Sequence, residues 1–389
     1  MAYGFAATLP VAMLVALATI FRMALGPGRH PLPWHPITVI LLIFICWMSV
    51  TTPFALNPDT DSVTYSWIQS LKIFLMLFVT LMLVRGRQQI EQLIWVLVVS
   101  VGYFGTKGGF FTITTGGSFH VWGPTGTFIE GNNELALALV TCIPLMYYLS
   151  MTTINKWLRV GLRISMVLCV FSILGSQSRG AFLAIVAMLM FLVLKSKKPV
   201  MSTLVFGVIL GLAALFMPAE WHSRMETISE YQEDGSAMSR INTWKTILNM
   251  IADRPIVGAG YRVGSDLLYQ LYSPGQWFKS FDAHSIYFQA LGEHGIPGLL
   301  IYLTLGVVTW RSAGRLAKAH STGSEATWIP LLMHMIQVSI IGFAAGGAFL
   351  GLLHYDFPYY LAAIVVLVDA SLREGKCIDQ SKSAQVTGN

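Results

Sequence analysis

The chain has 389 residues, of which 54% are apolar and 11% are charged, whereas an average soluble domain has roughly 45–50% apolar and 25% charged residues. This composition excludes an ordinary water-soluble protein. The net charge of +6 does not indicate nucleic-acid binding, because the basic residues gather in short loops between apolar segments.

Apolar runs recur along the whole chain, and each is close to the roughly 20 residues that a helix needs to cross a bilayer. The predicted fold class is therefore all-α, a polytopic transmembrane protein. We expect about eleven spans, near residues 5–21, 36–53, 66–84, 90–106, 132–151, 159–175, 180–194, 200–217, 285–309, 328–350 and 355–371.

The loops between these spans alternate in charge, which predicts their sidedness. The short basic loops contain Arg22 and Arg29, Arg85 and Arg87, Lys156 and Arg159, Lys195, Lys197 and Lys198, Arg311, Arg315 and Lys318, and Arg373 with Lys376. By the positive-inside rule these loops are cytoplasmic and the others face outward. An odd number of spans leaves the N-terminus outside, whereas a twelfth span upstream of Met1 would place both ends in the cytoplasm.

Two outward segments differ from short connectors. Residues 105–133 are rich in Gly, Thr and aromatic residues, which is typical of an irregular or re-entrant loop, although a plain flexible connector remains an alternative. We expect four regions: eight spans over residues 1–217, a periplasmic segment over 218–283, three spans over 284–372 and a cytoplasmic tail over 373–389.

The periplasmic segment contains a helix with two different faces, which we expect to lie along the outer membrane boundary. Its polar face has Arg240, Asn242, Lys245 and Asn249. Its apolar face is formed by Met238, Ile241, Trp244, Ile247, Leu248 and Ile251.

No metal or other cofactor is expected. The four cysteines form no CxxC pair and have no Cys/His ligand spacing. Asp59 and Asp61 resemble a metal-binding pair, but the stretch from Asn57 to Asp59 also has the composition of a turn followed by a helix cap. We favour the cap. Isolated ionisable residues within or beside spans carry weaker signals; they are Lys72, His334, His354 and Asp369.

Arg179 lies in a very short polar turn, residues 176–180, between two apolar segments. An arginine there can reach lipid headgroups, but that role does not require a tight polar turn. A guanidinium beside the N-terminus of the next helix is suited to bind phosphate. Arg240 and Arg262, together with Arg224 and Arg254, lie in the periplasmic segment, and each alone fits a solvated surface. Together with Arg179 they indicate a cationic pocket for a diphosphate.

His284 immediately precedes a predicted span, where an imidazole can act as a general base near neutral pH. Asp282 is a candidate to orient it, and Glu293 is a possible supporting carboxylate. A capping or interfacial histidine is the alternative. Gly295 and Pro297 should kink or break the helix that begins after His284.

Five short motifs resemble the O-antigen ligase superfamily of bacterial inner-membrane enzymes. They are residues 126–135 (GTFIEGNNEL), 176–180 (SQSRG), 239–244 (SRINTW), 253–260 (DRPIVGAG) and 284–298 (HSIYFQALGEHGIPG). Each motif is moderately specific, but their order is characteristic, and the resemblance extends over about residues 1–311.

The resemblance implies a glycosyltransferase that moves a polysaccharide from undecaprenyl diphosphate to a sugar hydroxyl of lipid A–core, at the periplasmic face of the inner membrane. It implies a fold similar to that of GT-C glycosyltransferases, without their usual metal, and inversion in a single displacement. Arg179 and Arg240 match the superfamily's diphosphate-binding arginines, and His284 matches its proposed catalytic histidine. Arg262 is a looser match. The expected partners are the lipid-linked donor, lipid A–core and membrane lipids.

Three alternatives remain. An O-antigen polymerase uses the same chemistry with a growing glycan as acceptor, and protein O-glycosylation ligases share the stretch from Glu130 to Glu134. A flippase or transporter for lipid-linked glycans belongs to another class. It would favour charges near the middle of the membrane and internal repeats, whereas the informative charges here gather on one face.

Overall fold

The computed structural model describes residues 11–26, 29–195, 235–275, 280–321 and 327–375, with four isolated residues between 204 and 211. All regular structure in these ranges is helical. The α-helices are α2 (Val11–Leu25), α3 (Pro36–Thr51), α4 (Thr60–Leu83), α5 (Gly86–Thr115), α6 (Asn132–Thr152), α7 (Lys156–Gly175), α8 (Arg179–Lys195), α11 (Gly235–Asp253), α12 (Asp266–Tyr272), α13 (Ile286–Ala319), α14 (Trp328–Gly347) and α15 (Phe357–Arg373); a 3-10 turn, η1 (Thr52–Phe54), continues α3.

The predicted spans within the described ranges coincide with helices. Seven helices in these ranges are long and apolar enough to cross a membrane: α3 with η1, α4, α5, α6, α7, α13 and α14. Shorter apolar helices occur at Met13–Leu25 and Arg179–Val193. The predicted span at 200–217 lies outside the described residues. The chain is a polytopic helical membrane protein, as its composition indicated.

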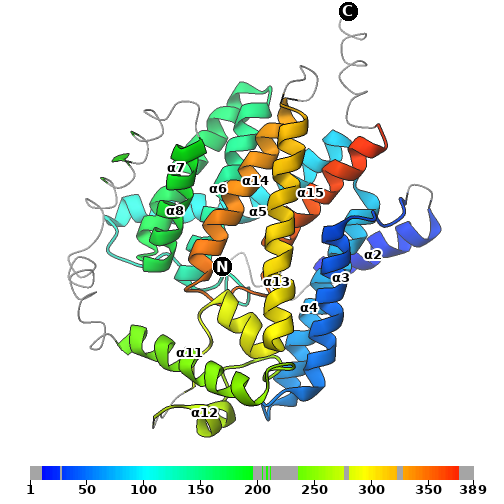
Figure 1. Cartoon of the computed structure of the whole chain (residues 1–389). Coiled ribbons are helices and arrows are strands. Elements are labelled where there is room, and N and C mark those ends of the chain that lie inside the picture. Colours follow the sequence, from blue (N-terminus) through cyan, green and yellow to red (C-terminus); the bar gives the residue numbers. More distant parts are fainter. Residues whose placement is uncertain are drawn as a thin grey trace, which may run out of the picture.

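The helices form a bundle whose long axis follows α13 (Figure 1). α13 packs against α3 and α14, α14 packs against α6 and α8, and α5 packs against α7. α11 and α12 lie across one end of the bundle, at the bottom of Figure 1. In the described ranges, α11 and α12 therefore cover the end of the bundle at which α13 begins.

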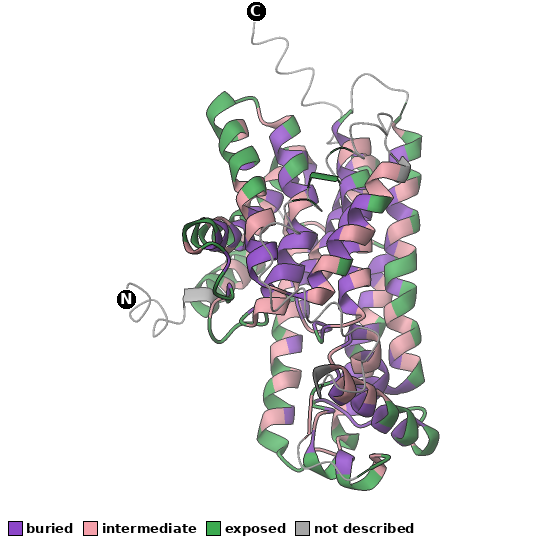
Figure 2. Cartoon of the chain, turned by 90° about the vertical axis from the view of Figure 1, so that its left-hand side faces the viewer, coloured by how far each residue is buried: buried purple, intermediate pink, exposed green. Residues whose placement is uncertain are grey.

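Helices of similar composition differ in the fraction of their residues that is buried (Figure 2). In α6, 78% of the most apolar window is buried, whereas in α4 the fraction is 28%. The apolar residues of α6 lie on all of its faces. This pattern is typical of a helix enclosed by protein. The other apolar helices keep an outward face that lipid would cover, so hydropathy alone does not distinguish the central helix.

The prediction of an irregular loop at residues 105–133 is wrong for its first part, because α5 continues to Thr115 and ends at Gly116, whose φ is 62°. The glycines of α5 serve helix packing. A Cβ atom at Gly109 would lie 1.9 Å from the carbonyl oxygen of Leu168 on α7. Small residues allow this close approach of membrane helices, and the packing outweighs the cost of about 1 kcal/mol for each glycine in a helix.

The predicted helix with two different faces is present as α11, but its buried face differs from the expected one. Leu248 is 52% exposed, while Asn242 is buried and donates to Ser273. Trp244 Nε1 donates to the carbonyl oxygen of Ala283 at 2.8 Å. The buried positions of α11 include Ser239, Asn242, Thr243, Thr246, Ile247 and Met250. Hydrogen bonds to α12 and to the loop before α13 therefore favour polar residues on the inner face.

The predicted break in α13 is confirmed at Gly295, which has φ 70° and ψ −173°. A Cβ atom there would lie 2.0 Å from the carbonyl oxygen of Ile256. The amide of Ile296 donates to the carbonyl oxygen of Pro255 at 2.8 Å. Trp47 Nε1 donates to the carbonyl oxygen of His294, also at 2.8 Å. The break thus joins α13 to α3 and to the segment after α11.

We predict that Gly295→Ala destabilises the protein. This combination of φ and ψ is accessible essentially only to glycine, and forcing another residue into it costs about 1–3 kcal/mol, to which the clash with Ile256 adds. The midpoint of thermal unfolding in detergent should fall. Gly306→Ala is the matched control, because a Cβ atom there meets no atom within 4 Å. An unchanged unfolding midpoint for Gly295→Ala would show that the break tolerates a side chain.

Candidate active site

A cavity of about 680 Å³ lies where the start of α13 meets α4, α6 and the segment after α11. Its walls combine parts of the chain that are far apart in sequence, and they include four of the predicted site residues, Arg262, Asp282, His284 and Glu293. The remaining lining residues are Tyr65, Ser66, Gln69, Gly126, Thr127, Phe128, Glu134, Tyr261, Val263, Ala283, Gln289, Gly351 and His354.

His284 enters the cavity from a strained position just before α13. Its φ is 44°, a value that costs a non-glycine residue about 1–3 kcal/mol and persists only where the surroundings impose it. Ser285 caps α13 by accepting a hydrogen bond from the amide of Phe288. On the opposite side, a Cβ atom at Gly351 would lie 3.7 Å from the amide nitrogen of His284. The helix cap holds the backbone next to His284, and the side chain of His284 lines the cavity.

Burial lowers the pKa of His284 below its ordinary value of 6.5, and the positive charge of Arg240 lowers this pKa further. The negative charge of Asp282 acts in the opposite direction and is the weakest of the three effects. His284 is therefore neutral near pH 7, which leaves one ring nitrogen able to accept a proton. No hydrogen bond joins Asp282 and His284 in the described part of the chain, so Asp282 acts on the imidazole through its charge.

Arg262 lies exposed at the cavity, and its backbone is also in the left-handed region, with φ 64°. Its side-chain Nε donates to Ser62 Oγ at 2.8 Å. Its backbone N–H donates to Glu293 Oε1 at 3.2 Å. The two glycines of the preceding motif make this turn possible, since a Cβ atom at Gly258 would lie 2.5 Å from the carbonyl oxygen of Gly292.

Arg179 and Arg240, the other two arginines that we predicted as diphosphate ligands, lie near the cavity but outside its described lining. The charge of Arg240, on α11, acts on both His284 and Glu134. Arg179 is half-buried at the start of α8. The next residue, Gly180, packs against Phe349, in the segment that continues to the cavity residue Gly351. The charge of Arg240 thus reaches His284. Arg179 is separated from the cavity by the segment that contains Phe349 and Gly351.

Asp59, which we considered as a metal ligand, is the N-cap of α4 and accepts a hydrogen bond from the amide of Ser62 at 3.0 Å. This is the role that we favoured from the sequence, and the carboxylate side chain stabilises the exposed first turn of the helix. Asp61 follows in the same turn and is exposed. The cap places Ser62 where it can accept from Arg262.

Sequence reasoning assigned no site role to three cavity residues of chemical interest, although it named His354 as a weak signal. Glu134 lies at the start of α6, within a motif that we had noted only for resemblance. Tyr261 is fully buried beside Arg262. His354 Nε2 lies 2.7 Å from Glu293 Oε2, although 61 residues separate them. The motif around Glu134 and the position of His354 beside a span were the available signals in the sequence, but nothing local marks the contacts of Tyr261 and His354.

Fold and cavity therefore define a polytopic membrane protein with a polar, histidine-containing site at one end of its helix bundle. Residues 164–303 match the O-antigen ligase family, and this range contains Arg179, Arg240, Arg262, Asp282, His284 and Glu293. Residues 1–154 match a family of unknown function, DUF5935. No curated protein matches the chain.

The match confirms the predicted relationship to the O-antigen ligase superfamily. In general terms, the family indicates a ligase or polymerase of the glycosyltransferase kind, which acts in a membrane environment on a lipid-linked glycan.

Proposed function

We propose that this protein is an O-antigen ligase. It transfers a polysaccharide from undecaprenyl diphosphate to a sugar hydroxyl of lipid A–core, at the periplasmic face of the inner membrane, with a GT-C-like arrangement of helices. The observation that carries the proposal is the cavity that combines a neutral His284 with Arg262 at its edge and the charge of Arg240 beside it.

His284 acts as the general base in this reaction. It accepts the proton of the acceptor hydroxyl while the acceptor oxygen forms a bond to the anomeric carbon of the donor sugar. The bond between that carbon and the diphosphate breaks, and undecaprenyl diphosphate leaves with the bonding electrons. A single displacement of this kind inverts the configuration at the anomeric carbon. The lowered pKa suits the role, because the base must be unprotonated before the reaction.

Arginines bind the diphosphate and stabilise the charge that develops on it as it leaves. The planar guanidinium group can donate two parallel hydrogen bonds to phosphate oxygens. Arg262 is at the cavity, Arg240 is close enough to affect His284, and Arg179 begins a neighbouring helix. Fixed positive charge in a partly enclosed site stabilises a leaving diphosphate without requiring a metal ion in the reaction.

An apolar cavity supports the lipid part of the proposal. It measures about 310 Å³ and lies between α13, α14 and α15. One end is formed by Ile286 and Tyr287, which follow His284 closely, and the other end by Trp310 and Arg311. A lipid diphosphate has its charged group at the level of the lipid headgroups and its chain among apolar helices. The polar cavity at His284 and the apolar cavity that begins at Ile286 follow each other in the same order.

The charge distribution along α13 supports the orientation of the site. The helix begins next to His284, and its last turns contain Arg311, Arg315 and Lys318. After the break at Gly295, residues 296–319 extend over about 36 Å at 1.5 Å per residue, which is enough to cross the roughly 30 Å hydrocarbon core. If the basic end is cytoplasmic, the cavity lies on the periplasmic side.

Purified protein in liposomes tests the function directly. With lipid-linked glycan and lipid A–core supplied on the side of the cavity, we expect glycan-bearing lipid A–core and free undecaprenyl diphosphate. Parallel reactions without lipid A–core, and with a protein acceptor, separate the related enzymes. Glycan extension alone would indicate a polymerase, and glycoprotein a protein ligase. Movement of intact donor across the bilayer without transfer would contradict the proposal.

We predict that Arg179→Lys and Arg240→Lys each weaken binding of the lipid-linked donor. Lysine keeps the charge but cannot donate two parallel hydrogen bonds, and a hydrogen bond involving a charged group contributes about 1.5–3 kcal/mol. Donor affinity should fall by about 10-fold or more, as measured by titration of the purified protein. Arg315→Lys, near the other end of α13 and outside both cavities, is the control and should bind normally. Unchanged donor affinity in both variants would assign these arginines a structural role.

We predict that His284→Ala lowers the rate of transfer by about 10²–10⁴-fold, as expected for loss of a general base, while donor affinity remains close to that of the wild type. Single-turnover transfer measures the rate, and titration measures the affinity. His320→Ala is the control, because His320 lies at the end of α13 opposite His284. If His284→Ala fails to bind donor, the imidazole contacts the diphosphate instead.

The dependence of the wild-type rate on pH gives the same assignment a second readout. A base whose pKa lies below 6.5 is more than half neutral at pH 6.5, and it reaches half protonation only below that value. Transfer should therefore keep more than half of its rate at pH 6.5 and decline further in more acidic solution. A rate that is already half lost at pH 6.5 would contradict the lowered pKa.

A further inference from the structure

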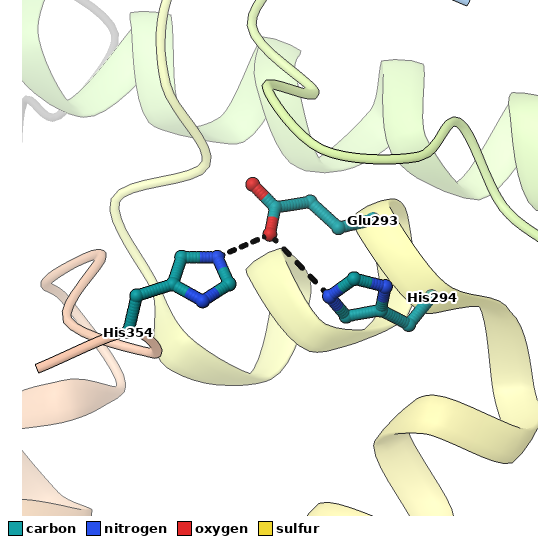
Figure 3. Close-up of side chains that lie close together, drawn as sticks. All are labelled: Glu293, His294 and His354. Carbon is teal, nitrogen blue, oxygen red and sulfur yellow. Dashed lines mark hydrogen bonds and ion pairs between the residues drawn. The ribbon is translucent and has the colours of Figure 1, made fainter. Parts of the chain in front are cut away.

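Three metal-binding side chains meet in the wall between the cavity and the core of the bundle. Glu293 and His294 are the last residues of α13 before its break, and His354 lies in the segment between α14 and α15 (Figure 3). One potential ligand atom from each residue lies within 4.8 Å of the other two. Glu293 and His354 also line the cavity, so the cluster is accessible from that side.

The hydrogen bond of His294 to Thr51 determines which ring nitrogen carries the proton. His294 Nδ1 lies 2.8 Å from Thr51 Oγ1. The hydroxyl of Thr51 donates its only hydrogen to the carbonyl oxygen of Met48 at 3.0 Å, so it must accept from His294. Nδ1 therefore carries a hydrogen, and in a neutral imidazole Nε2 then has a free lone pair.

His354 is oriented in the same manner. Its Nδ1 lies 3.3 Å from Ser70 Oγ, and the Ser70 hydroxyl donates to the carbonyl oxygen of Ser66 at 3.1 Å. The ring of Tyr261 stacks on His354, with 5.0 Å between centroids, and meets the ring of His294 edge-on at 5.1 Å. Both imidazoles are thus held by their outer nitrogens with Nε2 facing inward, which is the usual arrangement of histidine metal ligands.

Three electron-pair donors consequently face one another. His354 Nε2 lies 2.7 Å from Glu293 Oε2, and His294 Nε2 lies 3.7 Å from the same oxygen. His294 is fully buried, and its Nε2 has no hydrogen-bond partner. Such a buried, unsatisfied atom costs about 1–3 kcal/mol. A proton on His354 would satisfy the shorter contact, but it would leave His294 Nε2 unmatched.

We propose that Glu293, His294 and His354 bind a divalent transition-metal ion, with Zn²⁺ as the best fit. Two imidazole nitrogens and one carboxylate form a donor set that Zn²⁺ uses, with bonds of about 2.0–2.2 Å. Tetrahedral bonds of that length place donor atoms about 3.3–3.6 Å apart. The separations of 2.7 and 3.7 Å from Glu293 Oε2 lie on either side of this range, and all three ligand atoms lie within 4.8 Å of one another.

The role that follows is structural. Glu293 Oε1 already accepts from the backbone of Arg262 and from Gln289 Nε2, and Gln289 Oε1 accepts from the amide of Leu353. An ion on Oε2 would complete the link between the break in α13, the turn at Arg262 and the segment at His354. It would hold the inner wall of the cavity, while His284 and the arginines perform the reaction. The proposed site does not depend on the proposed function.

Metal content tests the site without any transfer assay. The purified full-length protein, with any affinity tag removed, is treated with chelator, equilibrated with Zn²⁺, desalted and analysed by mass spectrometry of the metal. We expect about one ion per chain and a higher midpoint of thermal unfolding. His294→Ala and His354→Ala should retain almost no ion. Glu293→Gln should weaken binding by more than the about 10–100-fold that is typical of losing a supporting residue.

His120→Ala and His320→Ala are matched controls, because they remove histidines outside the cluster, and each should still bind one ion. If the cluster variants fail to fold, X-ray absorption of the Zn²⁺-loaded wild type still decides the question. It should show two imidazoles and oxygen, without sulfur. Sulfur ligands would point to the cysteines instead. Wild-type protein that binds less than about 0.1 ion per chain at saturating Zn²⁺, or His294→Ala with full metal content, would overturn the proposal.

Discussion

The break of α13 at Gly295 is the constraint on which the architecture of the site depends. Only a residue without a Cβ atom fits beside the carbonyl oxygen of Ile256 in this conformation. The carbonyl of His294, freed from the helix, accepts from Trp47 on α3, and the amide of Ile296 donates to Pro255. One interruption therefore connects α13, its neighbour α3 and the segment after α11, and it places Glu293 at the junction.

Glu293 transmits this constraint to the cavity. Its Oε1 accepts from the backbone N–H of Arg262, and its Oε2 lies 2.7 Å from His354 Nε2. These two partners come from before and after α13 in the sequence. The strained backbones of Arg262 and His284 lie at the same cavity. Strain of this kind persists where surrounding contacts over-determine it. The result is a rigid wall in which charge and proton-accepting capacity have defined positions.

Electrostatics acts on both the base and the diphosphate of the proposed site. His284 is kept neutral by burial and by the charge of Arg240, with only weak opposition from Asp282. The same arginine charge that favours a bound diphosphate thus also favours an unprotonated base. A single arrangement would serve both requirements of the glycosyl transfer that we propose, because the leaving group needs positive charge near it and the nucleophile needs a vacant proton acceptor.

The sequence alone determined the all-helical membrane class, the positions of the described spans, the break at Gly295 and four cavity residues, because hydropathy, glycine and short motifs are local signals. Only the tertiary structure decided that α5 continues through its glycines, since their value is in the contact with Leu168 on α7. It also decided which face of α11 is buried. The meeting of His354 with Glu293 across 61 residues has the same cause: contacts between distant segments follow from packing, and no local pattern encodes them.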